Sequence, residues 1–224
     1  MKIDLLRIFF RFWLKNKKSE QKKINIDKVK VILVVSNTAI GDTLFSTPAL
    51  RLIKNSYPNK KIIALLNPKN IDLFRNNPSI DEYLEYDGKW RSFLRTRKTL
   101  IQKEIDIALI LHANEPQITP LIFFSNIKII LKAPNNNNEF KHLHYNSPIA
   151  KSLDKHFIDT RLELLEYIGI KEKSYLMDLF FSADDRKDRF KVSSKVWHIG
   201  FQIGASTPSR EWNNNGWSSL AEQF

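Results

Sequence analysis

Two side chains that can hold or move a proton, Asp42 and His112, each follow a predicted strand. Asp42, with Gly41 before it, comes a few residues after an unbroken aliphatic run at 31–35, and His112 directly follows a second run at 105–111. Such runs, without alternation, are typical of strands buried on both faces. Parallel strands end at one edge of a sheet, where open α/β sheets bind ligands, so we expect Asp42 and His112 to lie close together. The chemistry open to them is proton abstraction by a carboxylate and substrate contact by an imidazole.

Each of these residues also has a purely structural interpretation. Asp commonly caps a helix N-terminus, and a histidine at a strand end can simply bond a neighbouring loop. For the functional interpretation, Gly41 lets the backbone approach a ligand closely, and the helix dipole keeps a carboxylate at position 42 ionised. The local pattern leaves both interpretations open.

Strands and helices alternate along the chain. The predicted strands are 31–35, 62–66, 83–86, 105–111, 127–131 and 196–204. The predicted helices are one opened by Gly41 and Asp42 and stopped by Pro58, then 71–75, 90–103, 156–169 with Gly169 as its stop, and one from about Trp217. This order predicts an α/β fold, a doubly wound parallel sheet with helices on both faces.

The composition sets limits on the function. The 224 residues include 42% hydrophobic residues, enough for a real core, and no cysteine. Disulfides, thiolate metal sites and a thiol nucleophile are therefore excluded, which suits a reducing cytosol. The net charge of +12 favours an anionic partner: nucleic acid, anionic lipid or a phosphorylated sugar. We expect no nucleic acid, because the aromatic residues do not interleave with basic ones on any predicted pair of strands.

Residues 1–23 combine crowded apolar side chains with basic ones. Arg7 and Arg11 interrupt the apolar run, which is far shorter than the roughly 20 residues of a membrane-spanning helix, and no small-residue cleavage site follows. A basic, aromatic helix of this kind can lie in the headgroup layer of an anionic membrane. It can equally pack on the body of the protein through Phe9, Phe12 and Trp13.

The stretch from Asn37 to Pro58 resembles the first βα unit of glycosyltransferase family 9, the lipopolysaccharide heptosyltransferases. The matching features are the Gly-Asp pair after the first strand, a proline six residues beyond Asp42, and the Tyr-Pro that closes the helix. The resemblance implies a GT-B type fold of two Rossmann-like domains, with Asp42 as the general base. It also implies donor or substrate contacts, which we assign to Thr38, Gly41, Thr43 and His112.

A second part of the resemblance begins at residue 196. A strand, a Gly-Ala-Ser-Thr turn, a basic residue before tryptophan and a helix resemble the opening of the family's second domain. By position, Ser206 and Thr207 would bond the donor phosphate and Arg210 would balance its charge. The sequence departs from the family at Asn213, where proline usually follows the tryptophan.

These features predict four segments. They are a basic amphipathic segment at 1–28, an acceptor-side Rossmann-like domain at 29–170, a linker at 171–195, and the start of an incomplete donor-binding domain at 196–224. A full family member would continue for about another hundred residues, the size of a second domain. We therefore expect either a fragment or a truncated gene product.

The resemblance implies an inverting transfer of heptose from ADP-heptose to a lipopolysaccharide core sugar. We expect no cofactor besides the nucleotide-sugar donor and no metal, since no Asp-x-Asp loop is present and His142 and His144 lack a third ligand. The expected location is the cytoplasm, on the inner face of its membrane if residues 1–23 bind lipid.

A second class of function fits the same sequence. The alternative is a non-catalytic remnant that binds an anionic glycolipid or a partner. A nicotinamide oxidoreductase is disfavoured because the turn SNTAIGD has one glycine where G-x-G-x-x-G has three, and a P-loop NTPase because Gly-Lys-Ser/Thr is absent.

Overall fold

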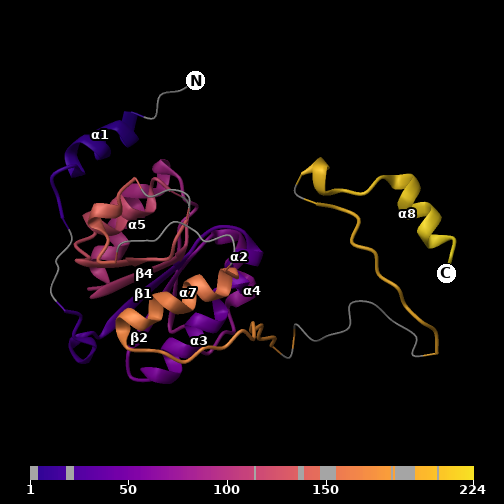
Figure 1. Cartoon of the computed structure of the whole chain (residues 1–224), viewed down its shortest axis with the longest axis horizontal. Coiled ribbons are helices and arrows are strands. Elements are labelled where there is room, and N and C mark those ends of the chain that lie inside the picture. The colour runs from indigo at the N-terminus through magenta and orange to yellow at the C-terminus, as the bar shows by residue number, and fades with distance from the viewer. Residues whose placement is uncertain are drawn as a thin grey trace. The chain divides into compact units, whose positions relative to one another are not determined.

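The computed structural model describes residues 5–18, 23–113, 115–135, 139–146, 155–182, 184, 195–205 and 207–224. The chain divides into two compact units, Met1–Ser182 and Ala183–Phe224 (Figure 1). The first unit holds the sheet, Asp42 and His112.

The first unit contains a five-stranded parallel sheet with the order β3-β2-β1-β4-β5. Its strands are β1 (Val31–Ser36), β2 (Lys61–Leu66), β3 (Glu82–Glu85), β4 (Ile107–His112) and β5 (Ile129–Lys132). The predicted parallel sheet is confirmed, and these five strands lie within two residues of the predicted bounds. The chain builds the sheet outward from β1 in one direction and then returns to add β4 and β5 on the other side.

Helices cover both faces of the sheet, as predicted. On one face lie α3 (Thr47–Ser56), α4 (Ile71–Phe74) and α7 (Phe157–Leu165), and on the other lie α1 (Leu5–Leu14), α5 (Trp90–Gln102) and α6 (Ile118–Phe124). In Figure 1, α5 lies above the strands and α3 and α7 below them. Alternate residues of β1 serve the two cores: Ile32 and Val34 face α3 and α7, whereas Leu33 and Val35 face α5 and α6.

The helix predicted from Gly41 to Pro58 is two helices, α2 (Ile40–Leu44) and α3, separated at Phe45 and Ser46. The buried Ser46 hydroxyl donates to the Asp42 carbonyl at 3.1 Å, and its oxygen lies 3.0 Å from the Ser36 hydroxyl. Pro48 has no N–H to donate and stands at the first turn of α3, where proline is well tolerated. The break turns α2 toward the end of β1.

The end of α7 follows the sequence prediction. A 3₁₀ turn at Glu166–Ile168 completes the helix, and Gly169 adopts a left-handed conformation with φ of 89°. The Tyr57 hydroxyl from the end of α3 donates to the carbonyl of Ile168. This bond ties the last turn of α7 to α3.

The second unit differs from its prediction. Residues 196–204 form no strand, because the described part of this unit offers no partner strand to satisfy their backbone groups. The predicted helix is present as α8 (Asn214–Ala221) and begins earlier than expected. Asn213, the departure from the family pattern, is its N-cap, since its side chain accepts a bond from the Gly216 N–H at 2.7 Å.

A buried polar cluster lies next to the end of β5. The Lys132 ammonium donates to the Glu115 carboxylate at 2.7 Å, and the Thr119 hydroxyl donates to the same carboxylate at 2.9 Å. Thr119 has then used its one proton, so toward His144 Nε2, 3.0 Å away, its oxygen is the acceptor. His144 Nδ1 is buried without a hydrogen-bond partner in the described residues. Burial, followed by the charge of Lys132, lowers the pKa of His144 to about 3.

We predict that the fold loses stability below pH 6.5 because of His144. The unfolded chain protonates this ring near its ordinary pKa of 6.5, whereas the folded chain does so only near 3, so the unfolded state binds more protons between these values. The free energy of unfolding should fall by about 1.4 kcal/mol per pH unit in that window. Urea unfolding between pH 7 and 5 measures it.

His144→Gln should flatten this dependence, because an amide can keep the bond to Thr119 without titrating. His198→Gln, an exposed histidine of the second unit, is the matched control and should leave the slope unchanged. An equal slope in the parent and in His144→Gln would contradict the assignment.

Candidate functional site

The candidate site lies where β1 and β4 end side by side. These neighbours flank the point at which the order of strands reverses, and open α/β sheets form a crevice at such a point. Their register shifts near the end, so that Val35 pairs with Ile110 but Ser36 pairs with His112. The Asn37 N–H then donates to the His112 carbonyl at 3.2 Å. The pairing brings the loop after β1 against His112.

Polar side chains hold the loop at 37–39 in place. The Asn70 amide donates to the Thr38 carbonyl at 3.0 Å and to the Thr43 hydroxyl at 3.1 Å. The Thr43 hydroxyl lies 3.2 Å from the Ser36 carbonyl and 3.1 Å from that of Ala39. Thr43 is fully buried. Thr43 thus secures the loop from inside, and its contact with substrate stays a prediction.

Asp42, Thr38 and His112 form a connected cluster. The Asp42 Oδ2 accepts from the Thr38 hydroxyl at 3.3 Å, the Thr38 oxygen lies 2.7 Å from His112 Nδ1, and His112 Nε2 lies 3.7 Å from Asp42 Oδ1. The predicted proximity of Asp42 and His112 is confirmed. The N-cap of α2 is Ala39, so Asp42 does not cap this helix.

The bonds of Thr38 fix the orientation of the imidazole. A hydroxyl has one proton, which Thr38 can donate either to Asp42 Oδ2 or to His112 Nδ1, so its position sets the tautomer of the imidazole. The other ring nitrogen, Nε2, then faces the Asp42 carboxylate. A proton on Nε2 would point toward the Asp42 Oδ1, 3.7 Å away.

Arg161 was missed in the sequence, although it lies beside Asp42. Its Nη2 is 3.7 Å from Asp42 Oδ1, its side chain is 2% exposed, and its guanidinium stacks over the Phe45 ring at 5.6 Å. Neither terminal nitrogen has a hydrogen-bond partner within the described ranges. Burial lowers the pKa of Arg161 to about 10, against the opposing effect of Asp42. The available signal was an arginine at helical spacing within the apolar stripe of α7, three residues after Ile158 and four before Leu165.

The cluster is open to solutes on one side. The side chains of Asp42 and His112 are 29% and 32% exposed, and Gly41 is exposed. A Cβ added at Gly41 would meet no heavy atom within 4 Å. A ligand can therefore reach the backbone at Gly41 and the carboxylate at Asp42 together.

The predicted donor-phosphate residues belong to the second unit. Ser206 lies outside the described residues. Thr207 is the N-cap of the 3₁₀ turn Pro208–Arg210, and both Thr207 and Arg210 are exposed. Their contact with a donor stays a prediction.

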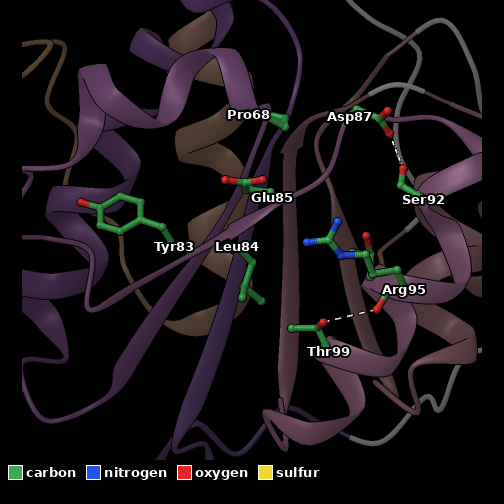
Figure 2. A pocket seen from close by; sticks show the side chains of 9 residues that line it. Pro68, Tyr83, Leu84, Glu85, Asp87, Ser92, Arg95 and Thr99 are labelled. Carbon is green, nitrogen blue, oxygen red and sulfur yellow. Dashed lines mark hydrogen bonds between the residues drawn. The ribbon is translucent and has the colours of Figure 1, made fainter.

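A separate pocket of about 390 Å³ lies along the edge strand β3, between it and α5 (Figure 2). Asp87 at its rim already accepts from Ser92 and Arg91. None of the predicted site residues lines this pocket. It is therefore distinct from the cluster at Asp42.

The described parts of the chain show neither a metal site nor a membrane-spanning helix. They contain no group of three or more His, Asp or Glu side chains arranged to bind a metal ion. His142 and His144 instead contact the Leu14 carbonyl and Thr119. None of the described helices has the length and apolar character that crossing a membrane requires.

Solved structures share this fold, although no protein-family model and no curated protein matches the chain. These neighbours are glycosyltransferases, and what this chain shares with them is a GT-B-like α/β fold. A family 9 glycosyltransferase from Veillonella parvula DSM 2008 superposes with a TM-score of 0.69 at 21% identity, over 91% of this chain and 61% of that one.

Two particular neighbours are heptosyltransferases from E. coli. ADP-heptose lipopolysaccharide heptosyltransferase II gives a TM-score of 0.65 at 20% identity, over 86% of this chain and 60% of that one. Heptosyltransferase WaaC, solved with ADP, gives 0.54 at 16% identity, over 66% and 50%. The chain thus spans less than two thirds of the length of these proteins. At such identities the likeness shows the fold.

We predict that Arg161→Met keeps or raises the stability of the fold. Its two terminal nitrogens have no hydrogen-bond partner among the described residues, so keeping this charge buried is costly. Asp42, its ion-pair partner, is 29% exposed and can be solvated by water when the cation is removed. The free energy of unfolding, measured in urea, should stay within about 1 kcal/mol of the parent or exceed it.

Arg97→Met is the matched control, because the half-buried Arg97 donates to the Phe124 carbonyl at 2.7 Å. Loss of that bond should cost about 1 kcal/mol. A loss above about 2 kcal/mol in Arg161→Met would show that Arg161 supports the fold instead of serving Asp42.

Proposed function

We propose that this chain is part of an inverting glycosyltransferase that moves heptose from ADP-heptose to a sugar of a lipopolysaccharide core. The observation that supports this most is the open Asp42 carboxylate at the strand switch point, next to an unobstructed Gly41. The fold is shared with heptosyltransferases solved with ADP and with ADP-2-deoxy-2-fluoro heptose. The net charge of +12 suits an anionic donor and acceptor.

In the proposed reaction, the Asp42 carboxylate takes the proton from the acceptor hydroxyl. The acceptor oxygen attacks the anomeric carbon of the donor as the bond from that carbon to the diphosphate oxygen breaks. The electron pair of the broken bond leaves with ADP, and the configuration at the anomeric carbon inverts. Thr207 and Arg210, with Ser206, would receive the charge that develops on the diphosphate.

The neighbours of Asp42 have separate roles in this proposal. Thr38 holds one carboxylate oxygen and His112 faces the other, so the carboxylate is oriented before an acceptor arrives. Arg161 Nη2 lies 3.7 Å from the same Oδ1 as His112 and places a buried cation beside the carboxylate. The absence of cysteine suits the reducing cytoplasm, where we place the reaction.

We predict that Asp42→Asn abolishes most transfer, because an amide of nearly the same shape cannot accept the proton. The rate of heptose transfer from ADP-heptose to a heptose-deficient lipopolysaccharide core should fall about 10²–10⁴-fold, as is typical for loss of a general base. Mass spectrometry of the acceptor measures it.

Asp72→Asn is the control, since Asp72 is an exposed carboxylate in the first turn of the short helix α4. It should retain the parent rate. Transfer by Asp42→Asn at the parent rate would exclude Asp42 as the base. Acceptor binding by the parent chain, without transfer or donor hydrolysis, would favour the alternative of a non-catalytic remnant.

We predict that Gly41→Ala separates ligand approach from folding. The added methyl has open space around it, and alanine is the better helix former, so the free energy of unfolding should not fall. Transfer should nevertheless weaken at least about tenfold if substrate packs against the backbone here. Unchanged kinetics would mean that no ligand atom comes close to Gly41.

A further inference from the structure

Helix α1 (Leu5–Leu14) packs on the rest of the first unit through one narrow face. Phe10 and Leu14 are its buried residues, and the Phe10 ring lies 5.2 Å from the rings of Trp90, Phe93 and Phe124. The Leu14 carbonyl lies 2.9 Å from His142 Nε2. These contacts fix which face of α1 turns away from the protein.

That outward face is also apolar. At 100° per residue, Leu5, Ile8 and Phe12 lie opposite Phe10 and Leu14, with Phe9 beside them. Leu5 is 74% exposed and Phe12 is 82% exposed, and Ile8 and Phe9 are more than half exposed. A helix that anchors by one face and presents large apolar side chains on the other marks a site of interaction.

The charges around α1 point to an anionic partner. Residues 5–18 include five basic side chains and no acidic one: Arg7, Arg11, Lys15, Lys17 and Lys18. Glu139 bonds Arg7 at 2.8 Å and lies 3.9 Å from Arg11, whose side chain stays 76% exposed. Lys17 lies over the Trp13 ring at 5.5 Å. Most of the positive charge is therefore available to a partner.

A groove of about 500 Å³ beside α1 has both exposed apolar side chains and basic ones in its lining. It is lined by Ile8 and Phe12 with Arg11 and Lys15, and by Glu139 and His142. Arg11 and Lys15 are one helical turn apart and so lie on one side of the groove. This pairing of cations with apolar side chains matches a phosphate above acyl chains.

We propose that α1 docks the protein on an anionic phospholipid surface, with Leu5, Ile8, Phe9 and Phe12 in the acyl boundary and Arg11 and Lys15 on headgroup phosphates. Helices with a basic flank and a bulky apolar face lie in this way in the interface plane. A second copy of this chain fits the surface less well, because its own five positive charges would repel them. The proposal does not depend on the transfer reaction.

Cosedimentation of the whole chain with vesicles tests the proposal. The chain should bind vesicles of phosphatidylcholine with about 30 mol % phosphatidylglycerol and bind pure phosphatidylcholine at least about tenfold more weakly. Binding should weaken as salt screens the headgroup charge. Failure to bind the anionic vesicles, or equal binding to both, would overturn the proposal.

Two variants separate the apolar contact from the charges. Ile8→Gln with Phe12→Gln should lower binding at least about tenfold. Arg11→Gln with Lys15→Gln should remove most of the preference for anionic vesicles. All four side chains are exposed, so the thermal unfolding of both variants should match the parent.

Leu94→Gln is the matched control, because Leu94 on α5 is as exposed as Leu5. It should bind like the parent. Equal losses in Leu94→Gln and in Ile8→Gln with Phe12→Gln would indicate general apolar adhesion and overturn the assignment to α1. A parent dimer in solution that Phe12→Gln dissociates would show instead that α1 joins two copies.

Discussion

The pairing of β1 with β4 is the constraint on which the candidate site depends. The two strands are distant in sequence, and only their parallel register sets the loop after β1 against His112. The shift in that register, from Val35 opposite Ile110 to Ser36 opposite His112, lets the Asn37 N–H bond the His112 carbonyl. Side chains alternate along a strand, so a shift of one residue decides which way the histidine faces. The contact between His112 and Asp42 therefore rests on backbone geometry laid down by the sheet core.

Around that contact lie the hydrogen-bonded loop at 37–39 and the buried guanidinium of Arg161. Asn70 and Thr43 use their hydrogen bonds inside the loop and leave Asp42 free to meet solvent, Thr38 and His112. Arg161 is placed below by α7, whose end is tied to α3. Neither terminal nitrogen of Arg161 has a hydrogen-bond partner among the described residues, and the nearest opposite charge that the structure records is the Asp42 carboxylate 3.7 Å away.

The sequence predicted the elements whose signals are local. Short, mostly apolar stretches predicted the five strands of the first unit, and Gly169 predicted the end of α7. The break between α2 and α3 depends on Ser46 reaching Ser36, which the pattern of apolar residues does not encode. The strand predicted at 196–204 needed a partner strand, and alternation alone cannot supply one. The burial of Thr43 and of Arg161 could not be predicted, because burial of a polar side chain is decided by the packing of distant elements.

The contact between Arg161 and Asp42 joins the interior of the first unit to its surface. The Arg161 side chain is 2% exposed and belongs to α7, which packs on α3, whereas the Asp42 side chain is 29% exposed. A shift of α7 against the sheet would therefore change the charge beside a carboxylate that solutes can reach. Internal packing and the electrostatics of the surface are coupled through this one pair of side chains.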